Sequence, residues 1–495
     1  MVHFGLRIID VVLKNDSKLK FLCLFLLTRL SSVLVVQTWF VPDEYWQSLE
    51  VSHRLSFGYG YLTWEWFEGI RSIIYPAVFC IPYKILAYLD LDSRQALIYV
   101  PRVIQALFSG WVEWSFMKET KSVLNGSQVS WFVLLELGNY FLYYVTSRTL
   151  ANTLEMNLIL LGISNFLSQC KGSFLLCVMI SCYIRPTSAP IWLPFLLHFF
   201  QQEKRWIFSK TFLKVVLKCS LVLGTVLGLD SWWYGKLVLV PVQFLLFNVV
   251  NDLSQFYGEH SWHWYFTNAL PSLMGPTLIP LVFTFSNKKT SNFIGSKVIT
   301  VQLSALLYIL CHSFVGHKEI RFLTPIIPLL NFLAAIKLQT LKWRKTFLVL
   351  FCTWNISLMW YLSVRHQRGV LDATNFIGLF VNPEDKVLYL MPCHSTPLYS
   401  HLHVNASLQF LTCPPNLQHL KHYIDEADRF YENPSKWLVD NPSWALAKYV
   451  VIFDALLDSI SSHLDSNGFH LIRNFFHADM DQGRVGRRVL VFKRE

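Results

Sequence analysis

Charged residues are scarce in this chain of 495 residues. Only 15% of the residues are Asp, Glu, Lys or Arg, 53% are hydrophobic, and the mean hydropathy is +0.37. Soluble domains carry about 25% charged residues, and their cores cannot hold so large a surplus of apolar side chains. The scarcity of charge therefore excludes an ordinary soluble protein and predicts a mainly α-helical, polytopic membrane protein.

Several catalytic and targeting patterns are also missing. The chain has no glycine-rich phosphate loop, internal repeat or low-complexity segment. Its Asp-x-Asp triplets, 90–92 and 479–481, lie outside any strand-rich nucleotide-binding sequence, so we predict no metal site. No small-residue cleavage site follows the first apolar run, which is preceded by lysines, and we expect a signal anchor with a cytosolic N-terminus.

Cysteine is rare in the polar parts of the chain. Eight of the ten cysteines lie in or next to apolar runs, where we expect them to act as small core residues. Cys393 and Cys413 lie in the polar C-terminal region. If this region is in the lumen of the endoplasmic reticulum, a disulfide between them is expected, with two free thiols as the alternative.

Long apolar runs are what the chain does have, and a membrane helix needs roughly 20 such residues. The runs lie near 21–40, 102–117, 129–145, 150–168, 173–200, 211–230, 269–286, 297–315, 321–337 and 346–364. If 173–200 consists of two short arms, these runs predict roughly 11 membrane segments, counting half helices. We expect them to form a transmembrane catalytic domain over residues 1–364.

Basic clusters between the runs predict the orientation of the chain, because such clusters face the cytosol. They lie at 14–20, 118–121, 204–210, 288–289 and 342–345. A consistent arrangement requires that 73–91 does not cross the membrane and that 173–200 is broken at residues 184–187. Membrane orientation also accounts for the net charge of +11, so no nucleic-acid partner is predicted.

The first polar segment, residues 37–76, directly follows the first apolar run. It contains adjacent carboxylates, Asp43 and Glu44, where a membrane helix ends and water begins. Carboxylates transfer protons, and aromatic rings offer flat faces to sugars or lipids. We therefore predict that Asp43 and Glu44 are catalytic. The candidate sugar-binding residues beside them are Tyr45, Trp46, Trp64 and Glu65.

Four arginines fall toward the predicted lumenal side, against the trend of positive residues facing the cytosol. They are Arg102, Arg148, Arg185 and Arg321, and His317 and Lys318 precede the last of them. Snorkelling at a helix end explains a single arginine, but four favour an anionic ligand. We predict that these six residues bind a phosphate.

A second polar stretch, 232–268, is dense in His and Trp. We predict that it contacts sugar, with an interfacial aromatic belt as the alternative. The candidate residues are Tyr257, His260, Trp262, His263 and Trp264.

From about residue 365 the sequence becomes polar, with short apolar or alternating runs at 386–391, 449–453, 469–476 and 488–493. These runs predict a small lumenal α/β domain over 365–495. It contains His394, a further candidate for sugar binding, in the phrase MPCHSTP. No nucleophile elbow supports a hydrolase, and the support for a zinc site is equally weak.

Together, these groups suit glycosyl transfer from a lipid-linked phosphosugar. The acceptor hydroxyl needs one base, and Arg and Lys can hold the charge of the leaving phosphate without a metal. A β-linked donor attacked in line gives an α product, so inversion needs no covalent intermediate. We therefore expect no metal ion or other cofactor.

The chain resembles glycosyltransferase family 22 of the GT-C superfamily. The phrases that carry the resemblance are VPDEYWQSLEVSH, FGYGYLTWEW, SRTLANT, IRPTS, FYGEHSWHWYF, HKEIRF and MPCHSTPLYSH. HKEIRF is typical of the whole family, whereas the first-loop phrase and MPCHSTP are similar to its third mannosyltransferases of GPI-anchor assembly. One departure lies near 403–407, where a further cysteine is expected.

The resemblance implies a GT-C-type transmembrane helix bundle in the endoplasmic reticulum membrane, with its active site and C-terminus in the lumen. The donor would be dolichyl-phosphate-mannose, and the acceptor a GPI precursor glycolipid with two mannoses, extended in α-1,2 linkage. Enzymes of this kind place their base on the first lumenal loop. This implies that Asp43 is the base, with Glu44 as the second candidate.

Two rival functions remain at this point. A sister mannosyltransferase would act on the N-glycan precursor or add a fourth GPI mannose. A lipid transporter is less favoured, because the chain shows no paired halves and a transporter needs no polar lumenal domain. The sequence predicts neither the oligomeric state, nor a protein partner, nor the side modifications of the acceptor.

Overall fold

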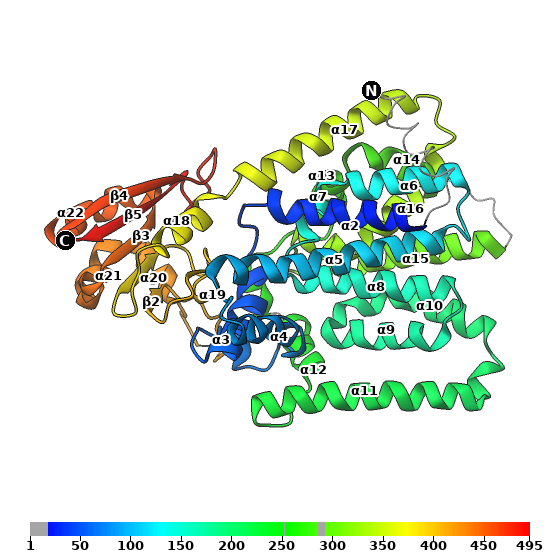
Figure 1. Ribbon diagram of the computed structural model, residues 1–495, viewed down its shortest axis with the longest axis horizontal. Helices are drawn as coiled ribbons and strands as arrows, with labels where there is room; N and C mark the ends of the chain where they lie inside the picture. The colour runs from blue at the N-terminus through cyan, green and yellow to red at the C-terminus, as the bar shows by residue number, and fades with distance from the viewer. Residues whose placement is uncertain (1–17, 252, 286–292, 419) are drawn as a thin grey trace. The chain divides into compact units, whose positions relative to one another are not determined.

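The computed structural model describes residues 18–251, 253–285, 293–418 and 420–495 (Figure 1). The chain is divided between two units. Unit 1 consists of Met1–Val33, Glu68–Ile74 and Val103–Met359. Unit 2 consists of Leu34–Phe67, Tyr75–Arg102 and Trp360–Glu495. The first polar segment up to Phe67 therefore belongs to the same unit as the C-terminal region.

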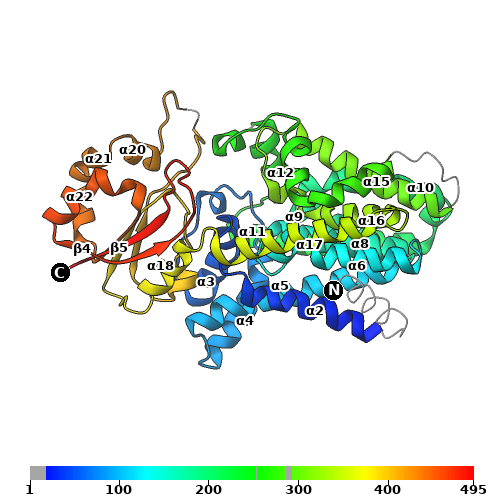
Figure 2. The ribbon, with the colours of Figure 1, turned by 90° about the horizontal axis from the view of Figure 1, so that it is seen from above.

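Apolar helices build unit 1, because a helix satisfies its own backbone hydrogen bonds in an apolar surrounding. They are α2 (Lys18–Val35, up to Val33), α5 (Arg94–Thr120, from Val103 onward), α6 (Gly126–Gly138), α7 (Tyr140–Val145), α8 (Ala151–Leu167), α9 (Lys171–Ile184), α10 (Ala189–Gln202), α11 (Lys210–Tyr234), α12 (Val240–Leu245), α13 (Leu270–Met274), α14 (Leu278–Phe285), α15 (Phe293–Ser313), α16 (Ile327–Leu338) and α17 (Arg344–Trp360, up to Met359). Helix α8 packs against α9, α10 against α15, and α16 against both α6 and α14 (Figures 1 and 2).

Five helical segments of the described residues are long and apolar enough to cross a membrane. They are Lys210–Tyr234, Tyr265–Thr284, Gly295–Ser313, Ile320–Leu338 and Arg344–Ile377. The mainly helical membrane architecture expected from composition is confirmed. The number of eleven membrane segments stays a prediction, since several of the other apolar runs form shorter helices.

The predicted break in the run 173–200 is confirmed. Helix α9 ends at Ile184, Arg185 has an extended backbone (φ −139°), and a short 3₁₀ turn over Pro186–Ser188 leads into α10. Proline cannot donate the backbone hydrogen bond that a continuous helix needs. The break places the Arg185 side chain at a turn rather than in the middle of a helix.

A second break lies in the run 129–145, where none is expected from the sequence. Asn139 separates α6 from α7, and its side-chain oxygen accepts hydrogen bonds from the backbone nitrogens of Phe141 and Leu142. Its amide nitrogen donates to the Leu273 carbonyl at 3.1 Å. A polar side chain that caps a helix inside an apolar run cannot be distinguished by composition from one that faces a neighbour.

Buried charges and one buried amide join four helices of unit 1. Arg29 of α2 forms an ion pair with Glu113 of α5 at 2.7 Å, and both side chains are fully buried. Arg29 also donates to the backbone carbonyl of Glu136 in α6. The side-chain carboxylate of Glu136 in turn accepts a hydrogen bond from Asn331 of α16. Charges inside a membrane bundle are tolerated where they pair with each other and face the interior.

Unit 2 contains the first polar segment, helix α4 (Ile74–Tyr88, from Tyr75 onward) and the C-terminal region. The first polar segment forms one helical stretch from η1 (Tyr45–Leu49) into α3 (Glu50–Phe57), followed by the short turn η2 (Trp64–Trp66). The helices of the C-terminal region are α18 (Gly369–Ile377), α19 (Tyr399–Leu402), α20 (Glu426–Glu432), α21 (Pro434–Asp440) and α22 (Leu457–Ser466).

A five-stranded sheet lies at the centre of the C-terminal region, with the strand order β2-β1-β3-β5-β4. Its strands are β1 (Lys386–Leu390), β2 (Ser407–Phe410), β3 (Tyr449–Phe453), β4 (Phe469–Phe476) and β5 (Arg488–Arg494). Strand β1 is parallel to β2 and β3, whereas β5 is antiparallel to β3 and β4. Four of these strands match the predicted runs, and only β2 was missed.

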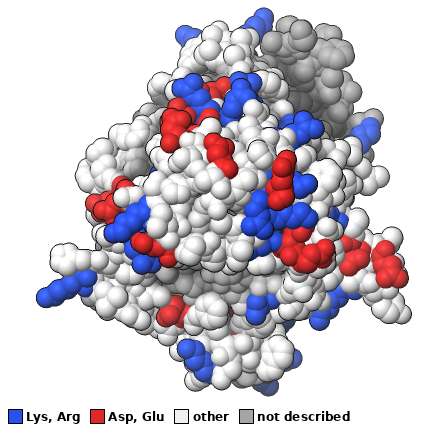
Figure 3. Space-filling model, turned by 90° about the vertical axis from the view of Figure 1, so that its left-hand side faces the viewer, with Lys and Arg blue, Asp and Glu red and all other residues white. Residues whose placement is uncertain are grey.

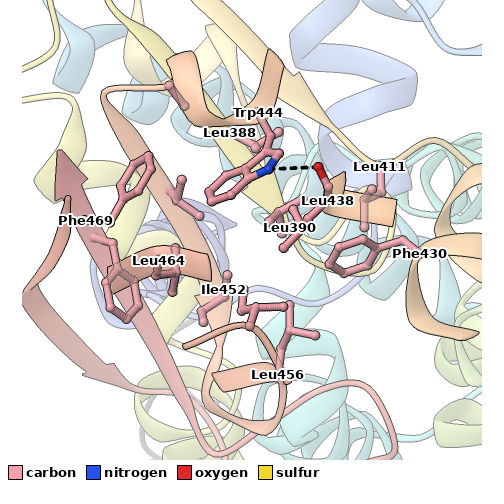
Figure 4. Packing of buried hydrophobic residues seen from close by; sticks show 14 of the residues in the cluster. Leu388, Leu390, Leu411, Phe430, Leu438, Trp444, Ile452, Leu456, Leu464 and Phe469 are labelled. Atoms are coloured by element: carbon pink, nitrogen blue, oxygen red, sulfur yellow. Dashed lines mark hydrogen bonds between the residues drawn. The ribbon is translucent and has the colours of Figure 1, made fainter. Parts of the chain in front are cut away.

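The helices α21 and α22 cover an apolar core formed with the sheet (Figure 4). Trp444 is buried there, and its indole nitrogen donates to the Leu438 carbonyl at 3.1 Å. On the face that Figure 3 shows, acidic and basic side chains lie close together in mixed clusters. Arg484 and Asp428, for example, form an exposed ion pair at 2.7 Å.

Candidate active site

The two adjacent carboxylates occupy the start of the helical stretch in unit 2. Asp43 and Glu44 are its first helical residues, and the backbone nitrogens of Tyr45 and Trp46 both donate to the Pro42 carbonyl at 3.0 Å. Negative side chains are favoured at the positive end of a helix dipole. Asp43 is half-buried, whereas Glu44 is buried with 1% of its surface exposed.

Glu50 fixes this helical stretch to the C-terminal region. Its carboxylate accepts hydrogen bonds from the backbone nitrogens of Leu398 (2.8 Å), Tyr399 (3.1 Å) and Ser400 (3.1 Å). The Ser400 hydroxyl donates a fourth bond at 2.6 Å. Burial raises the pKa of Glu50, although these four hydrogen bonds oppose the shift. Two phrases that carry the resemblance, VPDEYWQSLEVSH and MPCHSTPLYSH, thus meet at one side chain.

An aromatic cluster extends from the carboxylates into the C-terminal region. The Trp46 ring makes an edge contact with His394 (centroids 4.7 Å apart) and lies 5.0 Å from Phe410. Tyr45 makes a similar contact with His401 at 5.1 Å. Tyr45 and Trp46, both predicted to bind sugar, are therefore buried against other rings in this conformation.

His394 lies close to Asp43 and beside a disulfide. Burial lowers the pKa of His394 to about 4, while the charge of Asp43 acts in the opposite direction. Cys393 and Cys413 are joined by a disulfide with a Cα–Cα distance of 5.9 Å. Among the described residues, Cys393, His394 and Cys413 have atoms close enough to share a metal ion, but the disulfide occupies both sulfur atoms.

The other predicted residues of the first polar segment lie further along it. Trp64 is half-buried, and Glu65 is buried and accepts hydrogen bonds from the Gln47 amide at 3.1 and 3.2 Å. Arg102 donates to the Val36 carbonyl at 2.7 Å. Arg102 belongs to unit 2, whereas Arg148, Arg185 and Arg321 belong to unit 1, and a common role of the four arginines in binding a phosphate stays a prediction.

Two of the predicted phosphate ligands of unit 1 are paired with carboxylates, of which Glu155 is buried and Glu319 half-buried. The Arg185 Nε lies 2.9 Å from a carboxylate oxygen of Glu155. The Arg321 guanidinium donates two hydrogen bonds to Glu319, at 2.7 and 2.5 Å. Burial alone would raise the pKa of Glu319, but the charges of Arg321 and His317 outweigh it and hold the pKa well below its usual range.

The HKEIRF segment packs against the second polar stretch. The Lys318 ammonium donates to the carbonyls of His260 (2.7 Å) and Val315 (2.5 Å), and burial lowers the pKa of Lys318. His317 bonds to the Gly258 carbonyl at 2.9 Å and to Glu319 at 3.1 Å. Burial lowers the pKa of His317, but Glu319 outweighs that effect and raises it overall.

The aromatic residues of this stretch are mostly exposed. Trp262, Tyr257, His260 and His263 are exposed, and Trp264 is half-buried and stacks on His260 with ring centroids 4.5 Å apart. Exposed rings at such a position suit either a sugar or a membrane interface. Arg148 is instead buried, with its guanidinium 4.2 Å from the centre of the Tyr144 ring.

Known proteins resemble the chain over almost its whole length. It is 39% identical to "GPI mannosyltransferase 3" of Drosophila melanogaster, an alignment that covers 92% of this chain and 83% of the relative. It is 37% identical to "GPI alpha-1,2-mannosyltransferase 3" of Homo sapiens, over 94% and 85%. Residues 20–403 match the Alg9-like mannosyltransferase family.

The chain belongs to the Alg9-like mannosyltransferase family. Among solved structures, ArnT from Cupriavidus metallidurans bound to undecaprenyl phosphate is similar in fold, with a TM-score of 0.59 and 12% sequence identity. That similarity covers 96% of this chain and 97% of ArnT. The GT-C fold implied by the sequence motifs is thereby confirmed.

Sequence reasoning missed three carboxylates of this family member. Glu50 accepts hydrogen bonds from the segment that follows His394. Glu155 forms an ion pair with Arg185, and Glu319 with Arg321. Glu319 lies inside the HKEIRF phrase, so its neighbours could have indicated it. Glu155 lies inside the apolar run 150–168, so its charge could also have indicated it. Nothing in the local sequence distinguishes Glu50 from an exposed helical glutamate.

Proposed function

We propose that the chain is an α-1,2-mannosyltransferase of GPI-anchor assembly that adds the third mannose to a precursor carrying two. The observation that carries the proposal is the similarity to relatives with this name across nearly the whole chain, at 36% identity over 97% of it for the protein of Danio rerio. The donor is dolichyl-phosphate-mannose, and the reaction takes place on the lumenal side of the endoplasmic reticulum membrane.

The chemistry needs one base and one anion-binding group. Asp43 accepts the proton of the mannose 2-hydroxyl as this oxygen bonds to the donor C1. The C1–O bond to phosphate breaks at the same time, so the configuration inverts and dolichyl phosphate leaves as a monoester. The partial exposure of Asp43 supports this role, because a base must reach its substrate.

The cations of unit 1 bind the negative charge of the phosphate. Glu155 pairs with Arg185 and Glu319 with Arg321, and the charge of Glu259 acts on Lys318. The planar guanidinium groups of the two arginines suit a phosphate oxygen. We infer that these side chains stabilise the leaving group without a metal ion.

The test is mannose transfer by the protein purified in detergent. With labelled dolichyl-phosphate-mannose and the two-mannose precursor, we expect a three-mannose product whose new sugar an α-1,2-specific mannosidase removes. Preferred use of the N-glycan precursor or of the three-mannose GPI lipid would instead indicate a sister enzyme. Lipid movement across vesicles without mannose transfer would indicate a transporter. Cells lacking the protein should accumulate the two-mannose precursor.

A further inference from the structure

A cleft of about 300 Å³ opens on the C-terminal region, entirely within unit 2. It lies beside β2, the edge strand of the sheet, and is bordered by residues of α20, α21 and the turn that follows α21. Its apolar lining includes Leu388, Leu411 and Trp444, which belong to the core drawn in Figure 4. Its volume is at the lower end of the range for small-molecule sites, about 300–1,000 Å³.

The walls of the cleft combine aromatic rings with planar polar groups. Tyr61, Phe410 and Trp437 supply the rings, and Gln409, Glu426 and Asn441 supply amides and a carboxylate. A sugar ring has apolar C–H faces, which pack on aromatic rings, and hydroxyls, which bond to amide and carboxylate oxygens. A lipid chain would need a continuous apolar groove, which these polar groups interrupt.

The charge of the cleft further limits the class of ligand that it can bind. Among the described residues that line it, Glu426 is the single charged side chain, and no Lys or Arg is among them. The Thr412 nitrogen and hydroxyl both donate to one Glu426 oxygen, at 3.0 and 2.7 Å, and fix its orientation. A phosphate would be repelled by this carboxylate, whereas a neutral or amine-bearing sugar would not.

Packed rings connect the cleft to the candidate base. Tyr61 contacts Phe410 with ring centroids 4.9 Å apart, and Trp46 contacts Tyr61 at 5.8 Å. Trp46 lies in the first turn of the helical stretch that begins at Asp43. Tyr61 thus borders the cleft and belongs to the same polar segment as the catalytic candidates.

We infer that this cleft binds a neutral or amine-bearing sugar of the acceptor glycolipid, one that lies between the reacting mannose and the lipid. The inference rests on the proposed function and gives it a specificity determinant. The cleft adds affinity for the complete acceptor, and it leaves donor binding and the chemical step unchanged. Binding energy from remote parts of a substrate commonly serves such discrimination.

The experiment compares two acceptors and two variants. One acceptor is the complete two-mannose precursor, and the other is a lipid-linked dimannoside without the intervening sugars. Trp437→Ala removes a ring of the cleft, whereas Tyr431→Ala removes a ring outside it. Both rings pack on Phe430, at 5.3 and 5.2 Å, so the two variants disturb the core alike.

Trp437→Ala should raise the KM for the complete precursor about tenfold, the change expected when one ring contact is lost. The KM values for the dimannoside and for the donor should not change, and Tyr431→Ala should behave like the unmodified enzyme. An equal loss with both acceptors would indicate a structural role, and unchanged kinetics would exclude a bound sugar. Either result overturns the inference.

Two further measurements keep the outcome decisive. If Trp437→Ala does not fold, the double variant Gln409→Ala with Ser443→Ala changes two exposed side chains of the cleft. It should raise the KM for the complete precursor about threefold and leave the KM for the dimannoside unchanged. Equilibrium binding of the labelled precursor is measured alongside. Weaker binding in the cleft variants supports the inference, and unchanged binding overturns it, even if the unmodified enzyme transferred no mannose and the proposed function failed.

Discussion

Asp43 and Glu44 are chemically alike and adjacent, yet their surroundings differ. Glu44 is buried, its charge acts on Tyr75, and its carbonyl accepts a hydrogen bond from the Ser48 hydroxyl at 2.6 Å. Asp43 is half-buried, and its charge acts on His394. A general base has to come within hydrogen-bonding distance of the acceptor hydroxyl. The greater exposure of Asp43 makes it the better candidate, and Glu44 fits an orienting role.

Asp43→Asn tests this assignment, because it keeps the size of the side chain and removes its basicity. Mannose transfer should slow by about 10²–10⁴-fold, while the KM values for donor and acceptor stay within a few-fold of normal. Turnover is measured separately for Glu44→Gln. Near-normal turnover of Asp43→Asn, together with an inactive but folded Glu44→Gln, would reverse the roles of the two residues.

Arg321→Ala tests the phosphate site. Loss of a charge-assisted hydrogen bond costs about 1.5–3 kcal/mol, so the KM for dolichyl-phosphate-mannose should rise about 10- to 100-fold. Arg484→Ala is the control, because Arg484 forms an exposed ion pair in the C-terminal region and should leave the donor KM unchanged. An unchanged donor KM in Arg321→Ala would indicate that the pair with Glu319 is structural only.

At the scale of elements, Glu50 connects helix α3 with the turn before α19. Glu50→Ala removes both acceptor oxygens, so all four of its hydrogen bonds are lost. We expect a loss of about 2–3 kcal/mol in stability, against about 1 kcal/mol for Ser400→Ala, which removes one bond. Thermal unfolding in detergent measures both variants, and equal stability of the two would exclude the connecting role.

Helix α3 should also open more easily in acid. His53 is buried and bonds to His403 at 3.0 Å; burial lowers its pKa to about 3, with the charge of His403 acting in the same direction. The open state takes up a proton below pH 6.5, its usual pKa, while the closed state does not. The free energy of opening therefore decreases by up to about 1.4 kcal/mol for each unit by which the pH is lowered below 6.5.

Hydrogen exchange of the α3 amides between pH 6.5 and 5.0, corrected for the intrinsic rate, measures this slope. His53→Gln should reduce this slope by about 1.4 kcal/mol per pH unit. The change distinguishes the effect of His53 from that of Glu50, whose pKa is shifted in the opposite direction. His470→Gln, at a side chain that is 60% exposed, should leave the slope unchanged. The same slope in all three proteins would contradict the assignment.

The elements that the sequence predicted well are those with a strong local pattern. Strand β3 is buried at all five positions and reads as a continuous apolar run, and Pro186 marks the break after α9. Strand β2 has only four residues, which alternate between exposed and half-buried, so its pattern is weak. The Asn139 cap is local, but one asparagine in an apolar run does not distinguish a cap from a contact with a neighbour. The Glu50 contacts depend on partners far along the chain, which no local pattern reveals.

At the scale of the whole molecule, the candidate residues are divided between the two units. The candidate base and Arg102 belong to unit 2, whereas Arg148, Arg185, His317, Lys318 and Arg321 belong to unit 1. Motifs that are scattered in sequence identified both groups, but they could not predict this division, since each unit is assembled from separate segments. Variants in unit 1 should therefore change donor binding, and Asp43 variants should change turnover.

The orientation in the membrane is the last prediction. Asn125-Gly126-Ser127 and Asn405-Ala406-Ser407 are both glycosylation acceptor sequences with an exposed asparagine, so accessibility does not distinguish them. The basic clusters predict that Asn405 lies in the lumen and Asn125 in the cytosol. Asn355, in a third such sequence, is buried, and its side chain accepts a hydrogen bond from the Tyr140 nitrogen at 2.9 Å.

Glycosylation occurs only in the lumen, so mass spectrometry of the protein from eukaryotic cells should find glycan on Asn405 and none on Asn125 or Asn355. Asn405→Gln should remove the mass shift, and Asn125→Gln should leave it unchanged. Glycan on Asn125 would place the connection between α5 and α6 in the lumen and overturn the orientation of both helices. The candidate base and the C-terminal sheet would then need a new assignment to one side of the membrane.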